Sequence, residues 1–369
     1  MSDTTAYAAL GDRLLVVRGD GTDPGTSEGW TVTERLVGRD FECIAASPDR
    51  PDRAFAGTVE SGLQRTTDGG LASDASETSS DRRSDGGDTW DRVAPEIDDR
   101  VTSVAVSPHD PDVVWAGTEP SAVYRSTDGG DSWVPLPPLT DLPSESEWAF
   151  PPRPHTHHVR WLEPDPNDPE RLYVAIEAGA LVRTADALAE DPPSSDGAEF
   201  WRDRPDGARR DNHTLATHPD AEGRVYTAAG DGYAQSEDGG DTWAYPQEGL
   251  GHRYVWGMAV PRSDPDTVVV SAASGPRSAH TVSTAEAYVY RTETAGPGDG
   301  TEWDLAMDGL PEPEGTVRSV LAAADGPVLF ALNNRGLYRS TDAGASWDRL
   351  DLAWPDAYAS QTPRGLAVV

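Results

Sequence analysis

The sequence predicts an all-β fold, a seven-bladed β-propeller, on three observations. A turn pattern built from Ser or Thr, Asp, Gly and Trp recurs along the chain, and each copy follows the same succession of short β-rich runs. The two chain ends complement one another as parts of one further unit. No linker composition divides the chain, so we expect a single domain over residues 1–369.

The turn pattern has three full copies and a split one. The full copies are Ser126 to Trp133, Ser236 to Trp243 and Ser340 to Trp347. The split copy opens at Thr66 and closes at Trp90, after a polar insertion that includes residues 71–84. The chemistry fits a tight turn between antiparallel strands, because Asp accepts backbone N–H bonds, Gly takes positive φ and Trp begins the next strand.

This pattern resembles the Asp-box, S-x-D-x-G-x-[ST]-W, of the bacterial neuraminidase repeat (BNR) family. The resemblance implies a β-propeller, and it leaves the function open, because the family's propellers include sialidases, xyloglucan hydrolases, sortilin-type receptors and photosystem assembly factors. The sialidases also carry an R-I-P motif, which this sequence lacks, and the xyloglucan hydrolases use two propellers. No catalytic residue is therefore transferred from either.

Six blades are expected in chain order, each with four antiparallel strands, A innermost to D outermost. Each begins with an apolar strand A that ends near a Pro and closes with the turn and its Trp. The expected ranges are Glu42 to Trp90, Val101 to Trp133, His157 to Trp201, Asn212 to Trp243, Tyr254 to Trp303 and Val317 to Trp347. The turns of the third and fifth ranges are eroded.

The chain ends supply the seventh blade. Residues 4–36 contain three strand-like runs and a degenerate turn that ends at Trp30, but no strand A precedes them. Pro363 to Val369 reads as a strand A with nothing after it. Joined, these segments close the ring. One Trp per blade then occupies the same structural position: Trp30, Trp90, Trp133, Trp201, Trp243, Trp303 and Trp347.

The composition is strongly acidic. Asp and Glu number 64 against 30 basic residues, the formal net charge is −34, and all the basic residues are Arg. An acidic composition without Lys is similar to that of haloarchaeal, halophilic proteins, and it argues against nucleic acid and anionic membranes as partners. We expect a cytoplasmic monomer, because no basic N-terminal region or long apolar stretch occurs. The single Cys43 excludes an intramolecular disulfide.

The predicted ring has two faces. The turns lie on one face, whereas the loops that precede strand A or join strands B and C meet at the opposite mouth of the central channel. Of the eight His residues, His109 and His218 are expected on the turn face. The other six are expected at or near the mouth: His155, His157, His158, His213, His252 and His280.

A mostly polar column is expected at the mouth, six residues before the Pro that closes each strand A or its equivalent. Its members are Glu42, Thr102, His158, His213, Val255, Arg318 and Arg364. Arg160 shares a face with His158, since side chains two apart lie on one side of a strand. Other loops bring Asn212, Arg253, Tyr254 and Arg277 to the same rim. Alternatively, these groups satisfy one another as ion pairs between blades.

An Arg-rich mouth favours an anion, because guanidinium groups fit carboxylate, sulfate and phosphate. We therefore predict that the mouth binds, and as a further hypothesis hydrolyses, a small anionic or sugar-like ligand. His158 and His213 would act as acid/base residues, and Arg160, Arg318 and Arg364 would clamp the anion.

Three other hypotheses remain open. A Zn-like transition metal could be held by some of His157, His158, His213, His252 and His280, with a carboxylate such as Glu42 or Asp211. A glycosidase would need two facing carboxylates, for which Glu119, Glu177 and Asp231 are candidates. The rival is a non-enzymatic platform that binds a protein partner through Pro135 to Pro154, with Trp148 and Phe150, and through Ser274 to Ala287.

Overall fold

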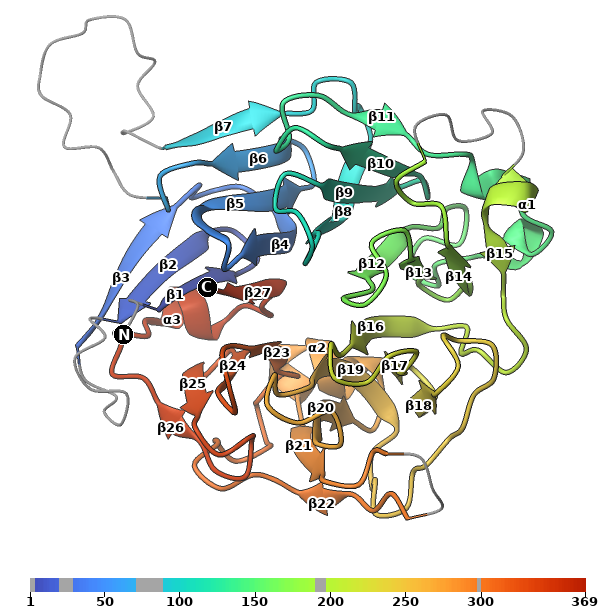
Figure 1. Ribbon diagram of the computed structural model, residues 1–369. Helices are drawn as coiled ribbons and strands as arrows, with labels where there is room; N and C mark the ends of the chain where they lie inside the picture. The colour runs from blue at the N-terminus through green and yellow to red at the C-terminus, as the bar shows by residue number, and fades with distance from the viewer. Residues whose placement is uncertain (1–3, 20–28, 71–88, 190–196, 297–299) are drawn as a thin grey trace, which may run out of the picture.

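The computed structural model describes residues 4–19, 29–70, 89–189, 197–296 and 300–369. Its strands form seven sheets arranged around a common axis (Figure 1). The predicted all-β, seven-bladed β-propeller is thereby confirmed. The polar insertion at residues 71–84 and the second half of the split turn, residues 85–88, lie outside the described residues.

Blades 1 to 3 run from an innermost strand to an outermost one, as predicted. Blade 1 comprises β4 (Phe41–Ser47), β5 (Arg50–Thr58), β6 (Gly62–Thr66) and β7 (Trp90–Val93). Blade 2 comprises β8 (Arg100–Val106), β9 (Val114–Glu119), β10 (Val123–Ser126) and β11 (Val134–Pro135). Blade 3 comprises β12 (Val159–Pro164), β13 (Leu172–Ile176), β14 (Ala180–Thr184) and β15 (Arg202–Asp203).

Blades 4 to 6 continue the ring. Blade 4 comprises β16 (Asn212–Thr217), β17 (Val225–Ala229) and β18 (Gly232–Ser236), and a single bridge between Gln235 and Ala244 stands for its outer strand. Blade 5 comprises β19 (Tyr254–Ala259), β20 (Val268–Ala273), β21 (Ala287–Thr292) and β22 (Asp304–Leu305). Blade 6 comprises β23 (Val320–Ala323), β24 (Leu329–Asn333), β25 (Gly336–Ser340) and β26 (Asp348–Arg349).

Blade 7 joins the two ends of the chain. It consists of β27 (Gly365–Val368), β1 (Thr5–Ala9), β2 (Leu14–Gly19) and β3 (Trp30–Arg35). Strand β27 pairs antiparallel with β1, from Ala6 opposite Val368 to Ala9 opposite Gly365. It also packs against β23 of blade 6 and β4 of blade 1, so it closes the ring as predicted (Figure 1).

The helices that the structure describes are short and lie in the connections. They are η1 (Leu139–Asp141), η2 (Glu145–Glu147), α1 (Gly197–Phe200), α2 (Pro276–His280), η3 (Val282–Thr284) and α3 (Asp356–Ala359). Within the described part of the chain, none of these helices has the length and apolar character needed to cross a lipid bilayer.

The recurring Asp holds each turn together. In blade 2, the Ser126 hydroxyl donates to Asp128 Oδ1 (2.8 Å) and accepts the N–H of Gly130 (2.9 Å). Asp128 Oδ1 also accepts the N–H of Ser132 (2.9 Å). Burial alone would raise the pKa of Asp128, but these donors lower it to about 2. Equivalent bonds surround Asp238 and Asp342, and we call these segments the Asp turns.

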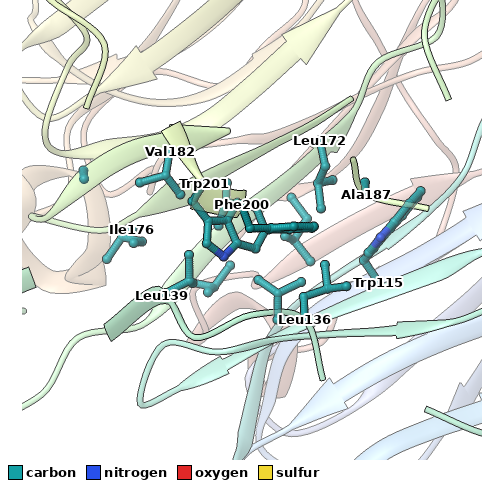
Figure 2. Packing of buried hydrophobic residues seen from close by; sticks show 14 of the residues in the cluster. Trp115, Leu136, Leu139, Leu172, Ile176, Val182, Ala187, Phe200 and Trp201 are labelled. Carbon is teal, nitrogen blue, oxygen red and sulfur yellow. The ribbon is translucent and has the colours of Figure 1, made fainter. Parts of the chain in front are cut away.

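The apolar core lies in clusters between neighbouring blades. The cluster between blades 2 and 3 packs Trp115 of β9 and Leu172 of β13 with Trp201, the Trp that precedes β15 (Figure 2). The Pro-rich connection contributes Leu136 and Leu139 to this cluster. All seven predicted Trp residues lie at the start of an outer strand or immediately before it, which confirms their shared position.

Arginines on the face of the Asp turns join each blade to the next. They occupy one position, the residue before the first residue of the turn, and each donates to a carbonyl oxygen of the corresponding turn in the following blade. The pairs are Arg18 with Gly69, Arg65 with Gly129, Arg125 with Ala187, Arg183 with Gly239, and Arg291 with Ala343. We call these five residues the clamp arginines. The sequence analysis did not anticipate them.

Candidate ligand site at the channel mouth

A β-bulge in five of the innermost strands brings polar side chains to the mouth. Each bulge lies near the beginning of its strand, in β4, β8, β12, β16 and β19. A bulge leaves one residue unpaired and re-aims its side chain. The bulged residues are Glu42, Thr102, Arg160, His213 and Trp256. In blades 3 and 5 they replace the predicted column members His158 and Val255.

Trp256 of β19 is the centre of one half of the site. The guanidinium carbons of Arg160 and Arg318 lie 4.6 and 5.0 Å from its ring centroid. The imidazoles of His213 and His280 contact the same indole, with ring centroids 4.1 and 4.3 Å away. The structure thus gathers predicted residues from four consecutive blades around a Trp that the sequence analysis missed.

Arg318 is almost fully buried beside this Trp, with 1% of its surface exposed. Its Nη2 donates to the carbonyl oxygen of Pro363 (2.7 Å). Its Nε and Nη1 have no hydrogen-bond partner among the residues that the structure describes. Burial lowers the pKa of Arg318 well below its usual value, and the charges of Arg160 and Arg364 add to this effect. A buried guanidinium with unused donors is costly unless it meets an acceptor.

Glu177 connects the arginines to the other half of the site. It follows β13 directly, and its Oε2 accepts a hydrogen bond from His158 Nε2 (3.0 Å) and lies 3.7 Å from Arg160 Nε. Burial opposes ionisation of Glu177. The hydrogen bond from His158 and the nearby charge of Arg160 outweigh it and lower the pKa of Glu177.

His213 and Asp211 complete this second half. His213 is 1% exposed, and its Nδ1 donates to the carbonyl oxygen of Val255 (2.7 Å). Its Nε2 lies 3.7 Å from Asp211 Oδ1 and has no hydrogen-bond partner within the described chain. Burial lowers the pKa of His213 and raises that of Asp211. Asp211 Oδ1 accepts the N–H of Ala178 (2.9 Å).

The five histidines of the predicted metal set do not come together. His157 hydrogen-bonds with Ser121 (2.8 Å), and His252 bonds with Tyr290 (2.7 Å) in blade 5. His280 bonds with Tyr254 (3.1 Å), and burial together with the charge of Arg318 lowers its pKa to about 2. His158 and His213 share the neighbourhood of Glu177.

Several other predicted ligand residues are engaged elsewhere. Glu42 is paired with Arg100, which also lies 3.4 Å from Glu119, as the interblade ion-pair alternative would have it. Asn212 is fully buried and donates to the carbonyl oxygen of Arg209. The exposed residues among the predicted ligands are Arg253, Arg277 and Arg364, and Arg364 lies near enough to influence the pKa of Arg318.

The other predicted carboxylates are paired with arginines, and one aromatic residue of the predicted partner surface is buried. Glu119 receives two bonds from Arg153 (2.8 and 2.6 Å), and Asp231 pairs with Arg209 (2.7 Å), so both carboxylates are engaged by arginines. Trp148 is 5% exposed and packs in the core between blades 2 and 3, which corrects its placement on a partner surface.

A separate cavity of about 670 Å³ lies on the face of the Asp turns, between blades 3 and 4. Arg183 lines it and is already bound to Gly239 and Asp241. Arg171, on the same wall, lies 3.5 Å from Asp165 and 3.2 Å from Asp168. These two arginines therefore have carboxylate partners, whereas no ion pair reaches Arg318 at the mouth among the described residues.

Comparison with known proteins places the fold and leaves the activity open. No family model matches the chain. An oligoxyloglucan-reducing end-specific xyloglucanase from Emericella nidulans is 24% identical over 301 residues, which cover 71% of this chain and 34% of that protein. The chain thus spans about a third of the length of this curated relative.

Solved structures share the propeller at low identity. An ancestral GH74 enzyme superposes with a TM-score of 0.57 and 14% identity, over 84% of this chain and 38% of that one. A structure of YCF48 bound to D1 peptide superposes with a TM-score of 0.52 and 18% identity, over 84% of this chain and 82% of that one. YCF48 from Cyanidioschyzon merolae superposes with a TM-score of 0.51 and 15% identity, over 87% of this chain and 86% of that one. At these identities the likeness extends to the fold alone.

Proposed function

We propose that the chain binds a small anionic ligand at the channel mouth. The observation that carries the proposal is Arg318, a buried guanidinium with two nitrogens that lack a partner among the described residues. A carboxylate, sulfate or phosphate oxygen would supply the missing acceptors.

Arg160 makes the same part of the mouth suitable for more than one oxygen. Arg160 and Arg318 lie 4.6 and 5.0 Å from one ring centroid, so their guanidinium carbons are at most 9.6 Å apart. Arg364 adds a third positive charge nearby. In a protein of net charge −34, such a local excess of Arg selects anions by position instead of by overall attraction.

The test is calorimetric titration with inorganic phosphate and with acetate, in the lowest KCl concentration that keeps the protein folded. Each hydrogen bond to a charged group contributes about 1.5–3 kcal/mol, so Arg318→Met should weaken binding by roughly 100-fold. Arg291→Met, a clamp arginine on the opposite face, is the matched control and should bind as the wild type does. Equal affinity in both variants would refute the proposal.

A second candidate is recognition of a peptide carboxylate by the same arginines. It is favoured by the likeness to YCF48. The superposition covers 84% of this chain and 82% of the YCF48 chain, as expected for two single propellers. The discriminating probe is an array of peptides with free or amidated C-termini. Binding that needs the free carboxylate and Arg318 supports this candidate, whereas phosphate binding without peptide binding leaves the small anion as the ligand.

Glycoside hydrolysis is the finer extension of the proposal. The likeness to GH74 propellers supports it, as does the presence of two carboxylates, Glu177 and Asp211, with oxygens within 4.8 Å. The bond from His158 to Glu177 occupies one of the oxygens that would have to act. Release of sugar from an aryl glycoside, abolished in Glu177→Gln, is the measurement that would establish hydrolysis.

We also propose that the chain belongs with the Asp-box propellers and is a halophilic, monomeric, cytoplasmic protein. The bonding of Asp128, Asp238 and Asp342 in their turns supports the first part. The net charge of −34 without Lys supports adaptation to high salt. Sedimentation and thermal unfolding in dilute and in molar KCl test these points, and a melting temperature that falls with added KCl would contradict the adaptation.

A further inference from the structure

Three potential metal-ligating side chains converge between blades 3 and 4 at the mouth. They are Glu177, which follows β13, Asp211, which precedes β16, and His213 of β16. One ligand atom from each lies within 4.8 Å of the other two. The cluster adjoins the arginines around Trp256 but is made of different groups.

The protonation of His213 is fixed by its surroundings. A carbonyl oxygen can only accept, so the nitrogen that lies 2.7 Å from Val255 O, Nδ1, carries a hydrogen. In the neutral imidazole the other nitrogen, Nε2, then presents a lone pair. That lone pair is buried, has no partner among the described residues, and faces Asp211 Oδ1 at 3.7 Å. In this tautomer the lone pair and the carboxylate oxygen are both acceptors, and no donor group of the described residues is recorded between them.

We propose that Glu177, Asp211 and His213 bind a divalent transition-metal ion of the Zn²⁺ class. One imidazole nitrogen and two carboxylate oxygens are ligands that Zn²⁺ accepts at about 2.0–2.2 Å, with a fourth position left for water. From separations of up to 4.8 Å, the ligand atoms need to draw together by about 1 Å to reach these bond lengths. Asp211 has 37% of its side chain exposed and gives the ion a path from solvent.

The residues behind the three ligands hold them in place, as metal sites require. Val255 orients His213, the N–H of Ala178 orients Asp211 (2.9 Å), and His158 holds Oε2 of Glu177 (3.0 Å). Within the described chain no hydrogen bond reaches Oε1 of Glu177, so this oxygen is available to the ion.

Gly230, in the turn after β17, lets the chain pass this close to Asp211. A Cβ atom at position 230 would lie 2.1 Å from Asp211 Oδ2, so a larger residue there would displace the carboxylate. Arg160 contacts the Oε2 side of Glu177. It limits the affinity of the site through charge repulsion but leaves Oε1 free. This metal site does not depend on the proposed anion site, because none of its three ligands is one of the arginines that would bind the anion.

The experiment is metal titration of the untagged full chain after chelation. Zn²⁺ is followed by elemental analysis and Co²⁺ by its visible absorption, in molar KCl with excess Mg²⁺, so that the acidic surface does not retain transition metal. We expect one ion per chain, and a tetrahedral Co²⁺ spectrum. His213→Gln and Asp211→Asn should each lose binding by at least about 100-fold, and His158→Asn should weaken it by about tenfold.

The matched control is His218→Gln. His218 is also buried, lies just beyond the end of β16, and uses both ring nitrogens, one with Pro261 O (3.1 Å) and one with the N–H of Asp220 (3.1 Å). It should retain one ion per chain. No ion in the wild type, or equal binding in wild type, His213→Gln and Asp211→Asn, would overturn the site. Should His213→Gln fail to fold, the more exposed Asp211→Asn decides the question.

Discussion

The clamp arginines and the arginines of the mouth occupy opposite faces of the same ring, and they differ in what they bind. Arg65 and Arg183, on the turn face, reach the next blade and find both a carbonyl oxygen and an Asp. Arg318, at the mouth, reaches a single carbonyl oxygen, and two of its nitrogens have no partner among the described residues.

This contrast separates fastening from binding. The five clamp arginines share one sequence position, and each meets a backbone acceptor of the next blade, so they hold the ring together. The mouth arginines also share one position, the polar column of the inner strands. Among the described residues, however, the carboxylate recorded beside them is Glu177, 3.7 Å from Arg160, and Arg160 and Arg318 surround Trp256. Under the proposed function, an anion would supply the partners that Arg318 lacks.

The largest expected effect contrasts two Arg→Met variants in stability. Arg183→Met should lower the free energy of unfolding by about 2 kcal/mol, because it removes charged hydrogen bonds to Gly239 and Asp241. Arg318→Met should leave stability unchanged or raise it, because it replaces an incompletely paired buried charge with an apolar chain of similar length. Chemical denaturation of both variants measures this. A larger loss for Arg318→Met would mean that this residue, too, is a fastener.

Chloride should distinguish the two faces next. An anion site at Arg318 and Arg160 is open to competition, so phosphate affinity should fall about tenfold between low and molar KCl. The clamp bonds end on neutral carbonyl oxygens as well as on carboxylates, so the same salt should not weaken the fold. Titrations and thermal melts on one set of samples give both numbers, and parallel losses of affinity and stability would break the distinction.

Acid should act on the turn face through Asp128. Its pKa is lowered to about 2 in the folded protein from an ordinary value of 3.8. A depressed pKa contributes stability above the unfolded value, and this contribution is lost as the pH falls from about 4 towards 2. Asp128→Ala should therefore cost about 1 kcal/mol at neutral pH, as loss of a capping side chain does, and progressively less below pH 4. Unfolding curves across this pH range test it, and a constant deficit would argue against the assigned role.

The smallest expected change is at Ala343, in the Asp turn of blade 6. It has φ +58°, whereas Gly239 stands at the matching position of blade 4 with φ +72°. Ala343→Gly should raise the free energy of unfolding by about 1 kcal/mol by removing this strain. The reverse change, Gly239→Ala, should cost at least as much, because it restores the strain and brings the new Cβ to a tight 3.3 Å from Arg183 Nη1. Opposite signs in thermal melts are the expected result.

The sequence was sufficient to predict the fold because short local motifs define each blade. The Asp turns need Ser, Asp and Gly within five residues, and each outer strand begins at a Trp, so periodicity alone counts the blades. The pairing of β27 with β1 was predicted because the N-terminal segment lacks an innermost strand and the C-terminal segment supplies one. The clamp arginines carry an equally local signal, Arg before the Ser or Thr of the turn, which Arg65 and Arg125 illustrate and which was overlooked.

The site was harder because it depends on small shifts in counting. In blade 3, Pro164 ends β12 and Pro166 lies two residues further on. The residue that matches Ser107 of blade 2 is Asp165, so the count starts from Pro166 and not from Pro164. The count then falls on Arg160 instead of His158. In blade 5 the bulge moves the column from Val255 to Trp256. Shifts of one or two residues like these cannot be recognised from the amino-acid composition or from the spacing of the repeats.

The contacts between blades were beyond the sequence altogether. Nothing in the spacing of Glu177 and His213 tells that they meet, since one follows strand B of blade 3 and the other lies in strand A of blade 4. The contacts that form on folding determine how these residues can react. His213 Nε2 is buried with no partner among the described residues, and Glu177 accepts a hydrogen bond from His158.

The join in blade 7 also determines how the ring responds to mechanical load. The first and last described residues of that sheet lie together, with Thr5 and Val369 exchanging backbone hydrogen bonds of 2.7 and 2.9 Å. Because β1 and β27 run antiparallel, a pull applied at Thr5 and Val369 loads their bonds one pair at a time. The ring would therefore unzip at low force from this one seam, while the other six blades, closed by continuous chain, stay folded until the seam has opened.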